Sequence, residues 1–547
     1  PHYGINAQCQ YLDALLQTDQ HTVAYPQIEQ LWLSADSRPE TCDAIFKQWQ
    51  AAGYKTPLII WQRFKLTMAL GNLHLARYLI KFMPTNEAAI AKKWIKIYKN
   101  PQLITTSEAL NIDHPDQANI LLHGLKRLSR KDISLAINTY QQLDKNIFNY
   151  SQNAQLFRYF GLRLAREHMP DASIWLSRIP ASHVDKQVEE WTIRTAIRQG
   201  DWRRLLSSIN NLSRHKQTEY RWQYWWAYAN AQLGNKNEAL GIYQYLATKR
   251  SYYGFLAADH LNLPYAFEEK AVEITPSAFK HVFERSEILR AREFYFMGHI
   301  ISARREWRQL IQHINNEEKL AASKIAQYWK WHDRAIITMG KTRYRDDIEL
   351  RFPLHLDKKV HAWSNQRKID PEWIYAIIRR ESAFMTDARS PVGAMGLMQL
   401  MPKTARHVAR QLNIRYKGRN SLLGSNTNIR LGTSYLERML SKLNSQQVLA
   451  TAAYNAGPHR VKKWLPIHNK MTAAQWIETI PFSETREYVS HVLAYTAIYQ
   501  HRMEKQITRL SLRMPLVPIK QPTSISKPVS NPPHTAQTQL TTPNGPS

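Results

Sequence analysis

The stretch Gln223–Leu246, QYWWAYANAQLGNKNEALGIYQYL, decides the fold class of this 547-residue chain. Aromatic and small apolar residues recur in it at helical spacing on both sides of a Leu-Gly-Asn turn. Two short helices joined in this way cannot bury their apolar faces alone, so they stack on neighbouring pairs. Related patterns occur at Phe157–Ile179, Trp191–Ile209 and Phe294–Ile311. We therefore predict an all-α chain that begins as a helical superhelix; because the period is irregular, an ordinary helical bundle is the alternative.

The character of the sequence changes three times along the chain. Residues 1–280 carry the helix-pair pattern, and a second helical stretch covers 281–351. Residues 352–514 hold most of the glycine-bearing loops beside long helices, which is typical of a compact α-rich domain with a cleft. Residues 515–547 are rich in Pro, Ser, Thr and Gln, with two lysines and no acidic residue. Such a segment lacks the apolar content that offsets ordering entropy, so we predict a disordered tail.

The formal net charge of +30 favours a polyanionic partner. Nucleic acid, an anionic lipid surface and an anionic wall polymer all fit, but the positive charge is spread along the chain and no nucleic-acid-binding motif is present. No run of 18 apolar residues exists, so we expect no membrane-spanning segment. The chain begins Pro-His-Tyr without Met, and we interpret it as a processed chain or a fragment.

Cys9 and Cys42 are the two cysteines of the chain. Because no histidine cluster lies near them, one disulfide is a better interpretation than a metal site. Two buried free thiols are an equally good alternative on the sequence alone. We expect no metal ion and no cofactor.

The segment 370–381, DPEWIYAIIRRE, places a carboxyl group on an apolar helix face. Asp370 suits an N-cap and Pro371 a first helical position. Glu381 continues, at helical spacing, an apolar stripe made of Trp373, Ile374, Ile377 and Ile378. A carboxyl group that loses hydration has a raised pKa, which a general acid at neutral pH needs. The ordinary alternative is a solvated glutamate at a helix end.

Three later segments carry further candidates. The loop 390–402, SPVGAMGLMQLMP, is apolar with two glycines, and the Gln399 amide could pair with an acetamido sugar or serve the loop itself. Tyr454 precedes a Gly-Pro break and could orient Glu381 or a substrate oxygen. Glu484 follows a plausible N-cap, Ser483, so the helix dipole explains it without a substrate.

A second carboxylate is scarce in this region. Between Ala388 and Ile477 the only acidic residue is Glu437, which falls on the polar side of its helix pattern. Ordinary glycosidases use two carboxylates that flank the scissile bond. Asp387 and Glu484 remain as possible second partners, and the pattern favours a one-carboxylate mechanism.

Four segments in series resemble the soluble lytic transglycosylases with a goose-lysozyme-like catalytic domain, of the large, seventy-kilodalton class. They are ESAF at 381–384, GLMQLMP at 396–402, AYNAG at 453–457 and PFSETREYV at 481–489. The resemblance implies a ring-like superhelical N-terminal domain (U-shaped), a helical linker domain that seats the catalytic domain, and a lysozyme-like catalytic domain at 352–514. The tail after residue 514 departs from the family pattern.

The resemblance also implies a reaction. Glu381 would protonate the bond between N-acetylmuramic acid and N-acetylglucosamine of peptidoglycan, with help from the substrate acetamido group instead of a second carboxylate. The same residue would then deprotonate the muramyl C6 hydroxyl, which closes a 1,6-anhydro ring. The residues implied to contact the substrate are Ser390, Gln399, Met401, Tyr454, Asn455, Glu484 and Tyr488.

The family is periplasmic, which agrees with a Cys9–Cys42 disulfide and a removed signal segment. We expect glycan strands as the partner and a monomer, with cell-wall synthases as candidate protein partners and no nucleic acid. A goose-type lysozyme that hydrolyses the same bond, and an inactive wall-binding helical scaffold, are the alternatives.

Overall fold

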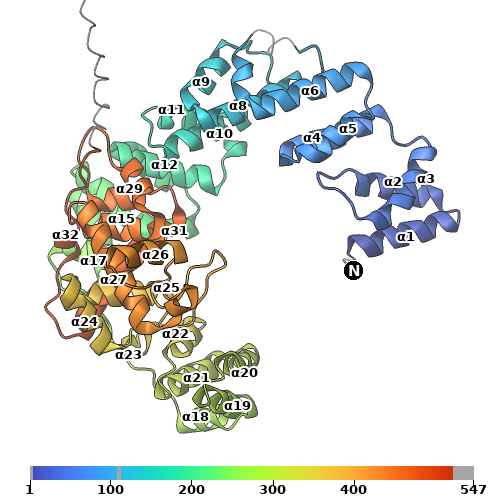
Figure 1. Ribbon diagram of the computed structural model, residues 1–547. Helices are drawn as coiled ribbons and strands as arrows, with labels where there is room; N and C mark the ends of the chain where they lie inside the picture. Colours follow the sequence, from blue (N-terminus) through green and yellow to red (C-terminus); the bar gives the residue numbers. More distant parts are fainter. Residues whose placement is uncertain (1–3, 107–111, 521–547) are drawn as a thin grey trace, which may run out of the picture.

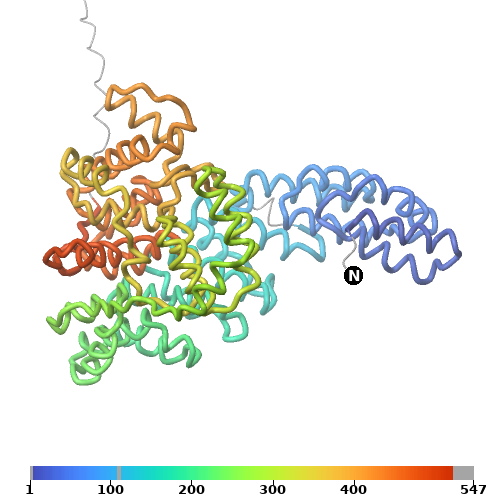
Figure 2. Tube along the Cα trace, turned by 90° about the horizontal axis from the view of Figure 1, so that it is seen from below, coloured from blue at the N-terminus to red at the C-terminus, as the bar shows by residue number. Residues whose placement is uncertain are grey.

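The computed structural model describes residues 4–106 and 112–520, and the chain in these ranges is almost entirely helical. The β-pairing in the described ranges consists of three isolated bridges, two of them around Met395. The helices follow an arc, and Figure 1 shows α1–α3 at one end, α18–α21 at the other, and the C-terminal helices α24–α32 between them. Figure 2 shows the same N-terminal arm reaching away from the rest of the chain. The predicted all-α class is confirmed.

The quoted stretch forms α15 and α16, with the turn at the predicted Leu-Gly-Asn. The other predicted pairs become α10 with α11, α12 with α13, and α19 with α20. The helices of the superhelix are α1 (Ile5–Gln17), α2 (His21–Trp32), η1 (Glu40–Cys42), α3 (Asp43–Ala51), α4 (Pro57–Leu70), α5 (Leu73–Ile80), α6 (Thr85–Lys99), η2 (Pro101–Thr105), α8 (Gln117–Lys131), α9 (Ile133–Gln142), α10 (Tyr150–Arg166), α11 (Ala172–Ser177), η3 (Ala181–His183), α12 (Lys186–Gln199), α13 (Trp202–Asn210), α14 (Arg214–Gln217), α15 (Tyr220–Gln232), α16 (Lys236–Ala247) and α17 (Tyr252–Leu261).

Two further groups of helices complete the described chain. The first group is α18 (Pro276–Phe283), α19 (Ser286–Phe296), α20 (Ile300–His313), α21 (Asn316–Tyr328), α22 (His332–Gly340) and α23 (Ile348–Arg351). The second group is α24 (Asp357–Arg367), α25 (Pro371–Glu381), α26 (Pro402–Gln411), η4 (Arg419–Leu423), α27 (Ser425–Lys442), α28 (Gln447–Ala456), α29 (Pro458–Trp464), α30 (Ala473–Glu478), α31 (Ser483–Arg502) and α32 (Leu510–Arg513).

Buried apolar side chains form three cores. One core lies within residues 9–191, and a small one lies within 272–350. The third joins residues 193–258 of the superhelix to residues 336–517. Helix α17 packs on α31 and α32, and α12 packs on α30. The later part of the superhelix therefore shares one core with the C-terminal helices, which holds the two regions together.

A buried charge cluster reinforces this junction. The carboxylate of Glu478, 2% exposed, accepts hydrogen bonds from Arg194 Nε at 3.2 Å and from the Tyr253 hydroxyl at 2.6 Å. Burial opposes ionisation of Glu478, but the nearby guanidinium groups of Arg221, Arg194 and Arg486 outweigh it and lower the pKa of this carboxyl. Breaking such a buried pair by removing one partner is strongly destabilising.

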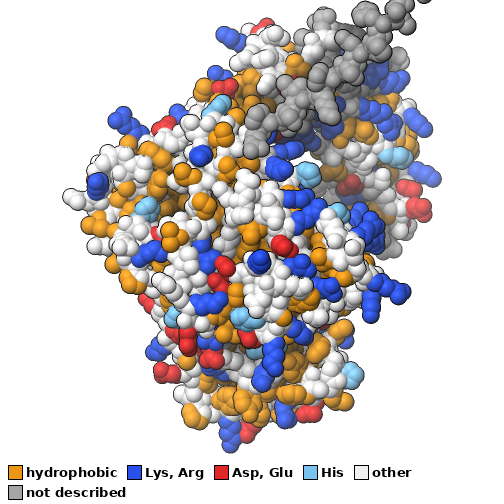
Figure 3. Space-filling model, turned by 60° about the vertical axis from the view of Figure 1, so that its left-hand side comes forward, with side chains coloured by type: hydrophobic (Ala, Val, Ile, Leu, Met, Phe, Trp, Pro, Cys, Tyr) orange, Lys and Arg blue, Asp and Glu red, His pale blue; other side chains and the backbone are white. Residues whose placement is uncertain are grey.

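Cys9 and Cys42 form a disulfide, which ties α1 to η1 and agrees with the first of the two interpretations of the sequence. In the described part of the chain, no helix combines the length and the apolar character needed to cross a membrane. Figure 3 shows lysine and arginine side chains scattered over the face that it draws, which agrees with the spread of charge along the sequence.

The first residues of the predicted tail are ordered. Val517 is buried and pairs with Met471 as an isolated bridge. The amide of Lys520 donates to the carbonyl of Pro466 at 2.7 Å. An apolar side chain at 517 and a backbone partner are enough to hold this short segment, and the rest of the predicted tail, 521–547, lies outside the described residues.

Candidate active site

The middle of helix α25 is buried on all sides, and its last three residues are partly exposed. Asp370 takes the N-cap position and Pro371 the first helical position, but the Asp370 carboxylate accepts from Arg513 instead of capping the helix. The residues from Glu372 to Ile378 are all buried. The sequence predicted burial of one face of this helix only, and that prediction was wrong. Glu372, which the pattern put outside the apolar face, is 3% exposed and accepts hydrogen bonds from Lys505 and Gln500.

Glu381 is the last residue of α25, and its side chain keeps partial access to solvent. The Tyr488 hydroxyl of α31 donates to Glu381 Oε1 at 2.8 Å. Burial raises the pKa of Glu381 to about 7, from an ordinary value of 4.5. The hydrogen bond from Tyr488 and the charge of Arg380 oppose this rise, whereas the negative charge of Glu484 adds to it. A carboxyl group with this pKa can both give and take a proton near neutral pH.

Two buried tyrosines near this carboxyl, Tyr454 and Tyr488, keep their hydroxyl protons. Burial, followed by the negative charge of Glu381, raises the pKa of both Tyr454 and Tyr488 well above the usual value for a phenol. Tyr454, predicted from the sequence to orient Glu381 or a substrate oxygen, donates to the carbonyl of Met398 at 2.8 Å, and its contact with a substrate oxygen stays a prediction. It therefore supports the 390–402 loop, while Tyr488 makes the direct contact with Glu381.

The 390–402 loop is held by its own polar groups. The amide of Ala394 donates to Ser390 Oγ at 2.9 Å, which closes a turn. Gln399 has a φ of +45° and donates its amide hydrogens to the carbonyls of Ala388 and Gly396. The amide nitrogen of Gln399 therefore stabilises the loop itself. Met401, the residue before α26, is 40% exposed.

Helix α27 supplies the support that the sequence argument missed. Asn428 is fully buried and receives and donates hydrogen bonds with the backbone of Met398, Met395 and Leu422. A Cβ on Gly432 would lie 2.3 Å from Met398 Sδ, so a larger residue at this position would force the Met398 side chain to move. Asn428, Gly432 and Leu436 are spaced four residues apart, so all three lie on the same face of α27. A polar asparagine on this apolar face is the feature of the sequence that could have predicted its buried role.

Asn455 and Glu484 lie together beside the loop. Thr485 donates to Asn455 Oδ1 at 2.6 Å, and Asn455 Nδ2 reaches Glu484 Oε1 at 3.5 Å. Glu484 is exposed in the first turn of α31, where the helix dipole stabilises a negative charge. The N-cap residue of this helix is Phe482, and not Ser483 as the sequence suggested. These residues line a cavity of about 450 Å³ that also includes Arg460.

The other acidic residues of the region are engaged elsewhere. Arg304 of α20 makes two hydrogen bonds of 2.7 Å to Asp387 and lowers the pKa of that carboxyl. Arg367 pairs with Glu437 at 3.5 Å. Glu484 alone among the acidic candidates acts on the pKa of Glu381. Because both oxygens of Asp387 are held by Arg304, this carboxylate is poorly suited to serve as a second catalytic group.

Comparison with known proteins places this geometry in a family. Sequence models match at residues 358–477 (Transglycosylase SLT domain), 281–348 (Soluble lytic murein transglycosylase L domain) and 479–507 (Soluble lytic transglycosylase helical domain). The third match covers α31 and the residues on either side of it, and not the N-terminal helices.

Relatives match over nearly the whole chain. The soluble lytic murein transglycosylase of Salmonella typhimurium is 32% identical over 92% of this chain and 79% of its own length. A solved inactive glutamate-to-glutamine mutant of lytic transglycosylase Slt from Pseudomonas aeruginosa has a TM-score of 0.81 and 34% identity, covering 93% of this chain and 84% of that one. The 70 kDa soluble lytic transglycosylase of Escherichia coli has a TM-score of 0.73 and 28% identity, covering 94% and 83%. The chain belongs to the family of soluble lytic murein transglycosylases.

Proposed function

We propose that Glu381 is the single acid/base of a non-hydrolytic cleavage of peptidoglycan between N-acetylmuramic acid and N-acetylglucosamine. The enzyme is a lytic transglycosylase that acts on peptidoglycan. The observation that carries the proposed mechanism is the raised pKa of Glu381 beside acidic neighbours that are paired or exposed. A solved relative is inactive as a glutamate-to-glutamine mutant, which supports a requirement for one glutamate.

In the proposed reaction, Glu381 donates one proton and later takes one proton back. Protonated Glu381 gives its proton to the glycosidic oxygen as the bond from that oxygen to the muramyl C1 breaks. The substrate acetamido oxygen stabilises the positive charge that develops at C1, in place of a second carboxylate. Ionised Glu381 then takes the proton of the muramyl C6 hydroxyl, and that oxygen bonds to C1. The products are a 1,6-anhydromuramyl end and a free 4-hydroxyl, and no water is consumed.

We propose separate roles for the residues around Glu381. Tyr488 stabilises the ionised form of Glu381 between the two proton transfers, because its hydroxyl donates to the carboxylate. Tyr454 holds the loop that contains Gln399 in place. We propose that Ser390, Gln399 and Met401 line the saccharide cleft, and that Asn455, Glu484 and the cavity beside them receive the sugar and peptide of the substrate.

Mass spectrometry of the products from purified peptidoglycan sacculi tests the proposal. Anhydro ends without a reducing group are expected, whereas reducing muramic acid would identify a goose-type hydrolase instead. Glu381→Gln should lower turnover by at least about 10²–10⁴-fold, the usual worth of a general acid or base. Glu487→Gln, on the exposed side of α31, is the matched control. If Glu484→Gln abolishes turnover as completely as Glu381→Gln while the fold is retained, the single-carboxylate mechanism is wrong.

We also propose a division of labour along the chain. Residues 1–280 present a basic superhelical surface to glycan strands, 281–351 form the linker domain, and 352–514 form the catalytic domain. The separate small core within 272–350 and the Arg304–Asp387 pair support this assignment of the linker. The disulfide supports an oxidising compartment, for which we propose the periplasm.

A further inference from the structure

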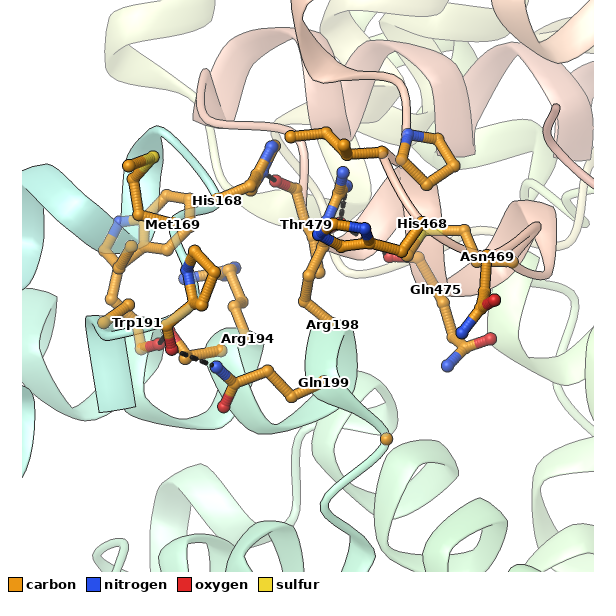
Figure 4. A pocket seen from close by; sticks show the side chains of 18 of the residues that line it. His168, Met169, Trp191, Arg194, Arg198, Gln199, His468, Asn469, Gln475 and Thr479 are labelled. Atoms are coloured by element: carbon orange, nitrogen blue, oxygen red, sulfur yellow. Dashed lines mark hydrogen bonds between the residues drawn. The ribbon is translucent and has the colours of Figure 1, made fainter. Parts of the chain in front are cut away.

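A second cavity lies between the superhelix and the catalytic domain, apart from the residues around Glu381. Its volume is about 410 Å³. Figure 4 shows its two walls: Arg194 and Arg198 project from α12, and Asn469 and Gln475 face them from the segment around α30. None of the residues that line it lines the cavity beside Glu484. It is therefore a separate site, of a size that suits a small ligand.

The walls of this cavity carry positive charge and no carboxylate. Arg194, Arg198 and Lys470 line it, and no aspartate or glutamate does. Of the two histidines in the lining, His168 adds no charge near neutral pH, because burial lowers its pKa to about 3. Arg198 donates to two neutral groups, the Trp464 carbonyl and Thr479 Oγ1. Burial without a carboxylate partner lowers the pKa of Arg198 to about 10. An anion in the cavity would compensate this charge.

Arg194 has a donor left over. Its side chain is 1% exposed, and its Nη1 and Nε atoms are taken by Glu190 and Glu478 at 2.8 and 3.2 Å. Its Nη2 atom has no hydrogen-bond partner within the described structure. This nitrogen is almost fully buried, so Arg194 contributes its charge to the cavity wall and does not present a free donor to a ligand.

The rest of the lining indicates what the anion is attached to. Asn469 places a side-chain amide at the cavity, and Trp191 adds an apolar wall. Gln199 also lines the cavity, and its amide nitrogen donates to the carbonyl of Pro170. The amide of Gln475 is engaged within the protein, because its nitrogen donates to Ile197 and its oxygen accepts from Thr472. Amides pair with the amide groups of a peptide, and cations pair with its carboxylates. Peptidoglycan, on which this enzyme acts, carries short peptides with free carboxyl groups on its muramyl sugars.

We propose that this cavity binds the free carboxylate end of a peptidoglycan stem peptide, at a site separate from the one that holds Glu381. The proposal rests on the proposed function for the identity of the polymer. A strand held here and at the catalytic domain is bound at two points, which raises the effective concentration of its glycosidic bonds at Glu381.

Isothermal titration calorimetry of the full chain with a stem tetrapeptide tests the proposal. The peptide has no glycosidic bond, so binding is measured without turnover and does not depend on the proposed mechanism. The free-acid peptide should bind, and the same peptide with amidated carboxyl groups should bind at least about tenfold more weakly, because charge-assisted hydrogen bonds are lost. Equal affinity for both peptides, or no binding of the free acid at millimolar concentration, overturns the proposal.

Two substitutions locate the bound peptide. Lys470→Glu reverses an exposed charge on the cavity wall and should weaken binding of the free-acid peptide about tenfold. Lys462→Glu reverses an exposed charge of α29 outside the cavity and should leave the affinity unchanged. Arg198→Gln should weaken it at least as much, with circular dichroism as the check on folding. If Glu484→Gln weakens binding and Lys470→Glu does not, the peptide occupies the catalytic site and the proposed second site is wrong.

Discussion

Replacing Glu381 with glutamine should stabilise the protein above neutral pH while it removes activity. The amide has almost the same shape as the carboxyl, and its oxygen can still accept the hydrogen bond from Tyr488. What changes is the charge. Wild-type protein must ionise a carboxyl group in surroundings that disfavour the charged form, and the glutamine variant does not.

The size of the effect follows from the pKa. Burial raises the pKa of Glu381 from 4.5 to about 7, so the folded protein holds this proton more tightly than the unfolded chain does. Stability from this group is therefore fully present below about pH 4.5 and is lost as pH rises to about 7. One pKa unit corresponds to about 1.4 kcal/mol, which gives a loss of about 3 kcal/mol. Because Glu381 is partly exposed, solvent screening reduces this, and about 1.5–3 kcal/mol is a fair range at pH 8.

Thermal unfolding of both proteins between pH 4 and pH 8 measures this difference. At about 2–4 °C per kcal/mol for a domain of this size, Glu381→Gln should melt several degrees above wild type at pH 8. The two melting temperatures should converge near pH 4, where wild-type Glu381 is protonated. Glu487→Gln, which neutralises an exposed carboxylate on α31, should show no such pH-dependent gain. A gain of equal size at both pH values, or none at pH 8, would refute the assignment of a raised pKa to Glu381.

Three further outcomes are expected. Tyr488→Phe removes the hydrogen bond that favours ionised Glu381, so the alkaline limb of kcat/KM should move to higher pH as kcat falls; an unmoved limb in a pH–rate profile contradicts this. Arg304→Gln breaks the two hydrogen bonds to Asp387, so it should lower the free energy of unfolding in urea by about 1–3 kcal/mol and reduce activity. Arg304→Lys should lower the free energy of unfolding by less. Full activity of Arg304→Gln would show that catalysis does not depend on this pair. Reduction of the Cys9–Cys42 bond, which closes a loop with a sequence separation of 33, should lower stability by about 4 kcal/mol, and an unchanged melting temperature in reducing agent would show that the bond is absent in solution.

Much of the site could be predicted because its signals are local. The position of Glu381 at the end of an apolar helix follows from Pro371 and from helical spacing. The helix pairs of the superhelix depend in the same way on residues three or four apart and on short turns. The neighbours that act in such patterns lie within one or two helical turns, so the linear sequence contains them.

Only the tertiary structure decided which side chains meet Glu381. Tyr488 is 107 residues away along the chain, and the sequence had suggested Tyr454 as the residue that orients Glu381. Likewise Asp387 remained a possible second acid until Arg304, 83 residues away, was seen to hold it. The choice depends on how α25, α31 and α20 pack, and helix packing is set by the shapes of whole faces and not by neighbours in sequence. Sequence spacing therefore determined which group could titrate, whereas three-dimensional packing determined its pKa and its partners.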